Sequence, residues 1–231
     1  MKSTGRIEFV DALRGVAALA VALVHMTEVT QLYTGMPDSW FTRFLSYGGQ
    51  GVDVFFVISG FVIAFSTAGG RHSASYFFRF VARRITRLDI PYWLAIAGEI
   101  AAIWLVGMIV SSKAKPIPEP QDILINGMYL QLFLGAPEIL IVAWSLCYEV
   151  QFYLVFVGTL CAYAGLRRLT GRSLPGITGL VVLLSTFSLS ALIFAGHLGA
   201  SPIGLFIDRW FEFSLGIMAY LYFSRQLVSC S

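Results

Sequence analysis

The chain has 231 residues, of which 57% are hydrophobic and only 13% are charged, with a formal net charge of +3. A typical soluble domain is about 45–50% apolar and about 25% charged, so this composition excludes an ordinary soluble domain and indicates a polytopic membrane protein. The aromatic share of 15% fits a protein that anchors side chains at two membrane interfaces.

Six apolar segments are each near the roughly 20 residues that a membrane-spanning helix needs. They are approximately Phe9–Tyr33, Val52–Ala68, Leu88–Val110, Ile139–Leu166, Ile177–Leu198 and Ile203–Phe223. A further stretch, Ile123–Leu134, is too short to span and is expected to be interfacial or re-entrant. The sequence therefore predicts an all-α polytopic transmembrane helical bundle, with about six long spans and one short helix in a single membrane-embedded domain over residues 1–231.

The charges between these segments predict the orientation of the chain. If six spans start from a cytoplasmic N-terminus, one side of the membrane carries Lys2, Arg6, Arg71, Arg79, Arg83, Arg84, Arg87, Arg167, Arg168, Arg172 and Arg225. The other side carries only Arg43, Lys113, Lys115 and Arg209. Because basic residues are enriched in cytoplasmic loops, we expect a multi-pass protein of the cytoplasmic (inner or plasma) membrane with both termini in the cytoplasm.

Arg14 and His25 are aligned in the first segment. His25 follows Arg14 by eleven positions, which at 100° each come to three turns plus about 20°, so both side chains face the same way, roughly 16 Å apart. A cation inside a membrane helix costs several kcal/mol unless it meets water, a partner or a ligand. One interpretation is a polar track from the cytoplasmic mouth into the membrane. The other is that Arg14 reaches the headgroups and His25 bonds to a neighbouring helix.

Two carboxylates are expected near the depth of His25. Counted from the predicted span ends, Glu99 and Glu149 both lie about 15–16 Å deep. A carboxylate bonded to one imidazole nitrogen orients the ring and raises its basicity, so these groups predict a proton-handling site. A structural salt bridge or a protonated glutamate is the alternative. Trp144 and Ser145, about a turn before Glu149, would line a substrate opening, or Trp144 is an ordinary interfacial tryptophan.

A basic cluster of Arg83, Arg84 and Arg87 precedes the third segment. The planar guanidinium bonds phosphate bidentately, so the cluster predicts an anion site for a phosphorylated cytosolic ligand. A topology signal in contact with anionic lipid explains it equally well. The aromatic residues beside the cluster are expected to anchor the interface, and no nucleic-acid partner is predicted.

Three smaller features complete the candidate list. Asp53, at the expected outer end of the second segment, would contact a polar acceptor or cap the helix. Ser59 and Gly60 predict a close-packing site for another helix. The three cysteines form neither a CxxC pattern nor a Cys/His spacing, so neither a disulfide framework nor a metal site is predicted.

Five of these motifs occur in one order along the chain. They are the pair Arg14 and His25, then Gly51–Phe61, Arg84–Arg87, Trp144–Tyr153 and Phe213–Gly216. Together they resemble the acyltransferase-3 family of integral-membrane acyltransferases, and the resemblance runs from Ile7 to about Tyr222. Each motif is weak by itself, whereas five in this order are highly specific.

The resemblance implies an O-acyltransferase. Family members transfer an acyl group, often acetyl, from cytosolic acyl-CoA to a hydroxyl of a glycan, a lipid-linked saccharide or a secondary metabolite. It implies acetyl-CoA as a donor substrate and no tightly bound cofactor. By the same resemblance, His25 is the general base, and Arg14 holds the pantetheine or phosphate region of the donor. Arg84 and Arg87 bind its nucleotide phosphates.

The remaining candidates and the rival functions stay open at this point. Glu149 is a second catalytic candidate, and Asp53 and Ser145 are candidates on the acceptor side. The family usually has further helices with a Ser-Tyr-x-x-Tyr-x-x-His-like block, so the chain, which ends at Ser231, is expected to be a short form or a fragment. A proton-coupled transporter or acyl conduit would use the same buried charges, and a truncated inactive partner of a membrane complex is the other alternative.

Overall fold

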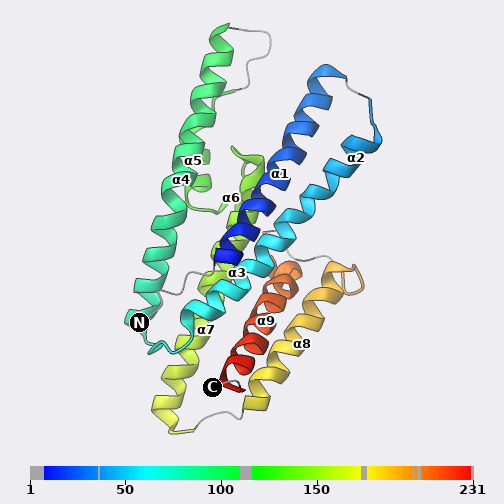
Figure 1. Cartoon of the computed structure of the whole chain (residues 1–231). Coiled ribbons are helices and arrows are strands. Elements are labelled where there is room, and N and C mark those ends of the chain that lie inside the picture. Colours follow the sequence, from blue (N-terminus) through cyan, green and yellow to red (C-terminus); the bar gives the residue numbers. More distant parts are fainter. Residues whose placement is uncertain are drawn as a thin grey trace. The chain divides into compact units, whose positions relative to one another are not determined.

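The structure, a computed structural model, describes residues 8–35, 37–109, 116–172, 176–199, 201 and 204–229. Its helices are α1 (Glu8–Thr34), α2 (Trp40–Ser46), η1 (Tyr47–Gln50), α3 (Gly51–Thr67), α4 (Ala74–Ile109), α5 (Pro120–Gly127), α6 (Gln131–Leu134), η3 (Ile141–Ala143), α7 (Trp144–Thr170), α8 (Gly176–Phe194), η4 (Phe206–Arg209) and α9 (Trp210–Ser229) (Figure 1). They confirm the predicted all-α class. Of the cations used to predict orientation, Lys2, Arg6, Lys113 and Lys115 lie outside the described residues.

The helices form two compact units. Unit 1 comprises Met1–Ala68 and Phe211–Ser231, and unit 2 comprises Gly69–Trp210. The pair Arg14 and His25 belongs to unit 1, whereas Arg84 and Glu149 belong to unit 2.

Five described segments, rather than the predicted six, are long and apolar enough to cross a membrane. They are Glu8–Leu32, Trp40–Thr67, Ala74–Ile109, Ile141–Thr170 and Ile177–Phe194. The predicted sixth segment, Ile203–Phe223, is not among them. The 3-10 turn η4 occupies part of it, and α9, with 20 residues from Trp210 to Ser229, also includes the charged Glu212 and Arg225.

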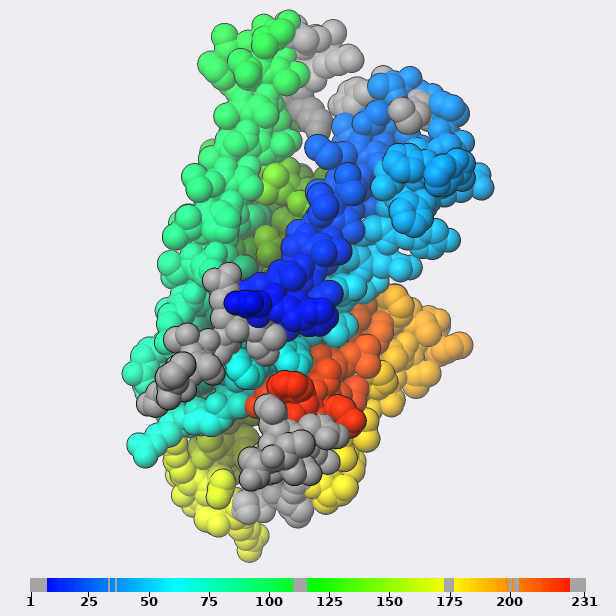
Figure 2. All heavy atoms as spheres, in the orientation of Figure 1, coloured from blue at the N-terminus to red at the C-terminus, as the bar shows by residue number. Residues whose placement is uncertain are grey.

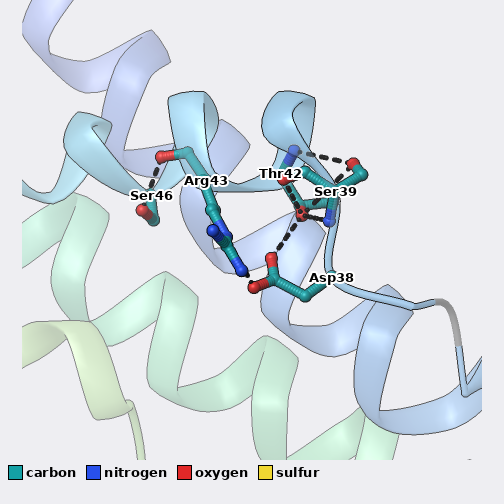
Figure 3. A network of polar contacts seen from close by, with 5 residues as sticks. All are labelled: Asp38, Ser39, Thr42, Arg43 and Ser46. Atoms are coloured by element: carbon teal, nitrogen blue, oxygen red, sulfur yellow. Dashed lines mark hydrogen bonds and ion pairs between the residues drawn. The ribbon is translucent and has the colours of Figure 1, made fainter.

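The second segment begins at Trp40, well before the predicted Val52, because a local cap starts the helix there. The backbone N–H of Thr42 donates to Ser39 Oγ at 3.2 Å, and that of Ser39 donates to Thr42 Oγ1 at 2.8 Å (Figure 3). This reciprocal pair is a capping box. Arg43 Nε also donates to Asp38 Oδ2 at 2.8 Å, and this bond lowers the pKa of Asp38.

In unit 1, glycines let α1 approach the second segment closely. A Cβ added at Gly48 would lie 2.6 Å from the carbonyl oxygen of Ala20, and one added at Gly51 would lie 2.8 Å from that of Ala17. The partner number falls as the glycine number rises, so the two helices run antiparallel. Figure 2 shows α1 lying against α2 and the start of α3. Backbone contact of this kind is how small residues join membrane helices.

A second close contact in unit 1 joins α3 to α9. A Cβ at Gly60 would overlap the backbone of Phe213, with the carbonyl carbon at 2.8 Å, and a Cβ at Gly216 would lie 2.6 Å from the backbone nitrogen of Phe61. The rings of Phe56 and Phe213 pack beside this crossing with centroids 4.7 Å apart. The prediction that Ser59 and Gly60 form a helix-packing site is therefore confirmed, since Ser59 is also buried.

In unit 2, α4 and α7 pack antiparallel. Arg168 Nη2 donates to the carbonyl of His72 at 3.1 Å, and a Cβ at Gly158 would lie 3.6 Å from the ring of Phe77. Further along, the helices share one apolar core made of Tyr92, Ile96, Tyr129, Ala143 and Cys147. Contacts far apart in sequence therefore set the register of these two helices.

The short stretch between α4 and α7 forms α5 and α6, with 8 and 4 residues. Neither is long enough to span, as predicted. Asn126, fully buried, organises the stretch: its Nδ2 donates to the carbonyls of Asp122 and Pro137, both at 2.9 Å, and its Oδ1 accepts from Ile139 N–H at 3.2 Å. One side chain therefore closes the loop that follows α6.

The end of α5 and the turn that follows it are held to α4 by aromatic side chains. Tyr92 Oη donates to the carbonyl of Asn126 at 3.0 Å, and Trp93 Nε1 donates to that of Gly127 at 3.2 Å. Tyr129 has φ 60°, an uncommon value for a residue with a side chain. Its ring stacks on Tyr92 at 4.8 Å, and its hydroxyl donates to Asp89 Oδ1 at 3.0 Å. Burial, followed by the bond to Asp89, raises the pKa of Tyr129.

Candidate functional site

One group of candidate residues, in unit 1, lies on α1. Arg14 and His25 are both half-buried on this continuous helix, which supports their predicted alignment. His25 Nδ1 lies 3.2 Å from Glu28 Oε2, with 39% of the histidine side chain and 63% of the glutamate side chain exposed. A carboxylate that accepts from Nδ1–H leaves Nε2 as the basic nitrogen. Glu28 thus orients His25 from within the same unit, a role that the sequence analysis considered for Glu99 and Glu149.

The pair lies at the margin of the contact between α1 and the second segment. Ala17 and Val24 on α1 are buried, at 5% and 6% exposure. Arg14 and His25 lie about 60° and 80° around the helix from Ala17. Side chains at these angles are half-covered, which suits groups that must contact both protein and a ligand.

Asp53 lies elsewhere than predicted. The antiparallel contacts of Gly48 with Ala20 and of Gly51 with Ala17 place it opposite the level of Arg14. It is about ten residues, or ~15 Å, from the level of His25. The predicted outer-end position is wrong because the second segment starts at Trp40, which puts Asp53 well inside the span. Asp53 is half-buried there.

A separate group of candidate residues, within unit 2, joins two motifs through Tyr153. The guanidinium carbon of Arg84 lies 5.5 Å from the centroid of the Tyr153 ring, and 5.6 Å from that of Phe80 on its own helix. The hydroxyl of Tyr153 donates to Glu149 Oε1. Arg84, Tyr153 and Glu149 therefore form a continuous series of contacts from α4 to α7.

The two arginines of the α4 motif differ in their surroundings. Arg84 is half-buried against aromatic rings, whereas Arg87, one turn further along, is exposed. Arg83 is also exposed, and its Nε donates to the carbonyl of Arg79 at 3.2 Å. The exposed guanidiniums are accessible to a phosphate, and Arg84 connects that surface with the interior of unit 2.

The expected shared depth of Glu99 and Glu149 is wrong. In the antiparallel register of α4 and α7, Arg84 meets Tyr153, so Glu149 lies opposite residues near Asp89. Glu99 is about ten residues, or ~15 Å, further along α4. The depth count failed because α4 begins at Ala74, fourteen residues before the predicted Leu88 (88 − 74). A joint acid–base role for the two glutamates is therefore not supported.

Ser145 lies in the first turn of α7, one turn before Glu149. Its hydroxyl donates to the carbonyl of Val142 at 3.2 Å. Beside it, the Trp144 ring faces the guanidinium of Arg209 at 5.9 Å, and Phe194 lies on that cation at 4.6 Å. The contacts of Arg209 therefore involve the neighbour of Ser145, Trp144, and the role of Ser145 at a substrate opening stays a prediction.

Sequence reasoning gave Tyr153 no role, although it ends the fourth motif. A usable signal was its i+4 spacing from Glu149, since residues four apart on a helix are neighbours. Asp89 and Tyr129 were also missed. No local signal relates these two residues, because they are 40 positions apart.

Comparisons with known proteins agree with the motif order. A family model for the acyltransferase domain of the acyltransferase-3 type matches residues 7–228. BcsY of Komagataeibacter xylinus, whose name describes a membrane-bound transacylase, is 30% identical over 92% of this chain and 50% of its own length. The exopolysaccharide production protein ExoZ of Rhizobium meliloti (strain 1021) is 31% identical over 66% of this chain and 43% of its own length.

The acyltransferase MdmB of Streptomyces mycarofaciens is 30% identical over 65% of this chain and 38% of its own length. The chain thus spans half or less of the length of these three relatives. No solved structure matches it significantly.

Proposed function

The chain belongs to the acyltransferase-3 family of membrane acyltransferases, and we propose that it transfers an acyl group, in the first instance acetyl, from acyl-CoA to a hydroxyl of an acceptor. The observation that carries the proposal is the half-buried His25, oriented by Glu28 in the segment that opens the family match. A polar pair inside a membrane helix costs free energy, and a catalytic role explains why the pair is present despite that cost.

The proposed step is a direct acyl transfer. His25 Nε2 takes the proton of the acceptor hydroxyl, and the hydroxyl oxygen attacks the thioester carbonyl of the donor. The new ester C–O bond forms, the C–S bond breaks, and the proton passes from His25 to the leaving coenzyme A thiolate. Glu28 stabilises the imidazolium that exists between these two proton transfers. Glu149 supports the reaction as a second acid–base group.

The donor is held by cations. Coenzyme A carries several phosphate charges, and the exposed Arg87 with the half-buried Arg84 offers guanidinium groups that bind such oxygens bidentately. Arg14, on the same side of α1 as His25, would hold the pantetheine or phosphate region of the donor. On this proposal the N-terminus and these cations lie on the cytoplasmic side of the cytoplasmic membrane, where acyl-CoA is available.

The proposed acceptor is a glycan, a lipid-linked saccharide or a similar hydroxyl-bearing molecule. Support comes from the name of ExoZ, an exopolysaccharide production protein, and from the setting of Ser145. Aromatic rings and an arginine beside that residue are groups that contact sugar rings and hydroxyls.

The test uses the full chain reconstituted in lipid vesicles. Radiolabelled acetyl-CoA is added with a crude glycan and glycolipid fraction, and bound and transferred label are counted separately. We expect transfer by the wild type, loss of transfer but not of binding in His25→Ala, and weakened binding in Arg84→Ala/Arg87→Ala. His197→Ala, at an exposed histidine outside the site, is the matched control.

Unchanged transfer by His25→Ala would overturn the mechanism. Label that crosses the vesicle membrane without forming an acyl ester would favour the transporter. Neither binding nor transfer by a folded wild type would favour the inactive partner.

A further inference from the structure

We propose that Tyr153 is a positioning residue that couples the donor-binding Arg84 to the carboxylate of Glu149. The inference rests on the proposed function, because it assigns a coupling role within the same site. No sequence motif connects donor binding with acid–base chemistry, whereas one tyrosine side chain contacts both groups.

The ring of Tyr153 holds Arg84. Two aromatic faces lie within 6 Å of the guanidinium, at 5.5 Å for Tyr153 and 5.6 Å for Phe80. This is the range in which a cation is attracted to an aromatic ring. Phe80 is one turn away on α4 and moves with Arg84, so Tyr153 is the contact that ties the guanidinium to α7.

The hydroxyl of Tyr153 holds Glu149. It donates to Oε1 of that residue from the next turn of the same helix. The donor lies on a residue that is only 4% exposed, so the ring has little freedom to turn away. A buried ring of this kind fixes the position of the carboxylate oxygen that it bonds.

The two contacts use different parts of the Tyr153 side chain. Phenylalanine at position 153 keeps the ring and removes the hydroxyl, whereas leucine removes both. A donor phosphate that binds Arg84 changes the contact between its guanidinium and the ring of Tyr153. The hydroxyl on the same ring is bonded to Glu149. Donor binding and carboxylate position are therefore linked by a single rigid group.

The main experiment separates binding from turnover in the reconstituted full chain. In Tyr153→Phe we expect an unchanged Kd for acetyl-CoA and a kcat lower by roughly 10–100-fold, the range for losing a hydrogen bond to a charged group. In Tyr153→Leu we expect the same loss of kcat and a Kd raised by roughly 3–10-fold.

Two comparisons exclude a merely structural role. Because Tyr153 acts through Glu149, adding Tyr153→Phe to Glu149→Gln should lower kcat no further than Glu149→Gln alone. Independent losses that multiply would overturn the proposal. Tyr163→Phe, about ten residues further along α7, removes a hydroxyl from the same helix and should keep the wild-type kcat.

A spectroscopic readout tests the coupling without any transfer. We would introduce 3-fluorotyrosine at position 153 and record its ¹⁹F resonance. Both Arg84→Ala and Glu149→Gln should shift this resonance, and acetyl-CoA should shift it only when Arg84 is present. Arg172→Ala, an exposed cation at the end of α7, is the control.

The outcomes separate the two proposals. If the wild type transfers label and Tyr153→Phe has the same kcat, the coupling is refuted and the proposed function stands. If the wild type neither binds nor transfers label, but the resonance still shifts in both Arg84→Ala and Glu149→Gln, the proposed function is refuted and the series of contacts stands. A resonance that neither variant shifts overturns the inference outright.

Discussion

Alanine at Gly60 or Gly216 should separate α3 from α9 and destabilise unit 1. A Cβ at Gly60 would overlap the Phe213 backbone, with its carbonyl carbon at 2.8 Å, and a Cβ at Gly216 would lie 2.6 Å from the Phe61 nitrogen. Both obstacles are backbone, so no side-chain rotation relieves the overlap. The helices must move apart or bend instead.

The size of the effect follows from overpacking. Inserting a methyl group into a tightly packed site costs roughly 1–3 kcal/mol, and the better helix propensity of alanine returns up to about 1 kcal/mol. A chain of this size loses about 2–4 °C per kcal/mol. For a net loss of about 1–2 kcal/mol, we expect the midpoint of thermal unfolding to fall by roughly 2–8 °C for either substitution.

The assay is thermal unfolding of the purified chain in detergent, followed by intrinsic fluorescence. Gly98→Ala is the matched control, because a Cβ there meets nothing within 4 Å and the glycine also lies in a long helix. It should raise the midpoint slightly or leave it unchanged. The double variant Gly60→Ala/Gly216→Ala should cost less than the sum of the two, since one separation relieves both contacts. Equal midpoints for Gly60→Ala, Gly216→Ala and the control would refute the backbone contact.

Two further substitutions test the loops. Asn126→Ala should lower the unfolding free energy by about 2–4 kcal/mol, because it leaves the Pro137 carbonyl and the Ile139 N–H without this hydrogen-bond partner. Asn126→Asp keeps an acceptor for the Ile139 N–H but sets a carboxylate oxygen against the carbonyls of Asp122 and Pro137, so it should cost at least as much in the same thermal assay. The pKa of Asp38 is lowered by its bond from Arg43, so the carboxylate stabilises the fold above its ordinary pKa and this stabilisation is lost as pH falls. The unfolding midpoint of Asp38→Asn should lie below that of the wild type, and this difference should shrink as the pH falls from roughly 5 to 3. A difference that stays constant with pH would contradict a stabilising bond between Arg43 and the Asp38 carboxylate.

Much of the architecture was predictable because it depends on local patterns. Long apolar runs can only become helices in a bilayer, where backbone groups must bond internally. The alignment of Arg14 with His25 needs only the helical repeat, and the i+3 contact of His25 with Glu28 follows from the same geometry. Ser59 and Gly60 indicated close packing because small side chains let backbones meet.

The positions that were mispredicted depend on contacts between distant residues. The depths of Asp53 and Glu99 were counted from segment ends, but the cap at Ser39 and the start of α4 at Ala74 moved those ends. Hydropathy marks where a helix is apolar, and it does not mark where the helix begins or which residue of another helix lies opposite. That register is set by packing of complementary side chains.

The motif order along the chain was sufficient to recognise the family, since it depends on residue identity alone. The series from Arg84 through Tyr153 to Glu149 was not predictable, because it needs two antiparallel helices in one particular register. A shift of one residue turns a side chain by 100° around the helix axis and breaks such contacts. The sequence therefore determines which chemical group stands at each position, whereas the contacts between those groups form only when α4 and α7 pack together.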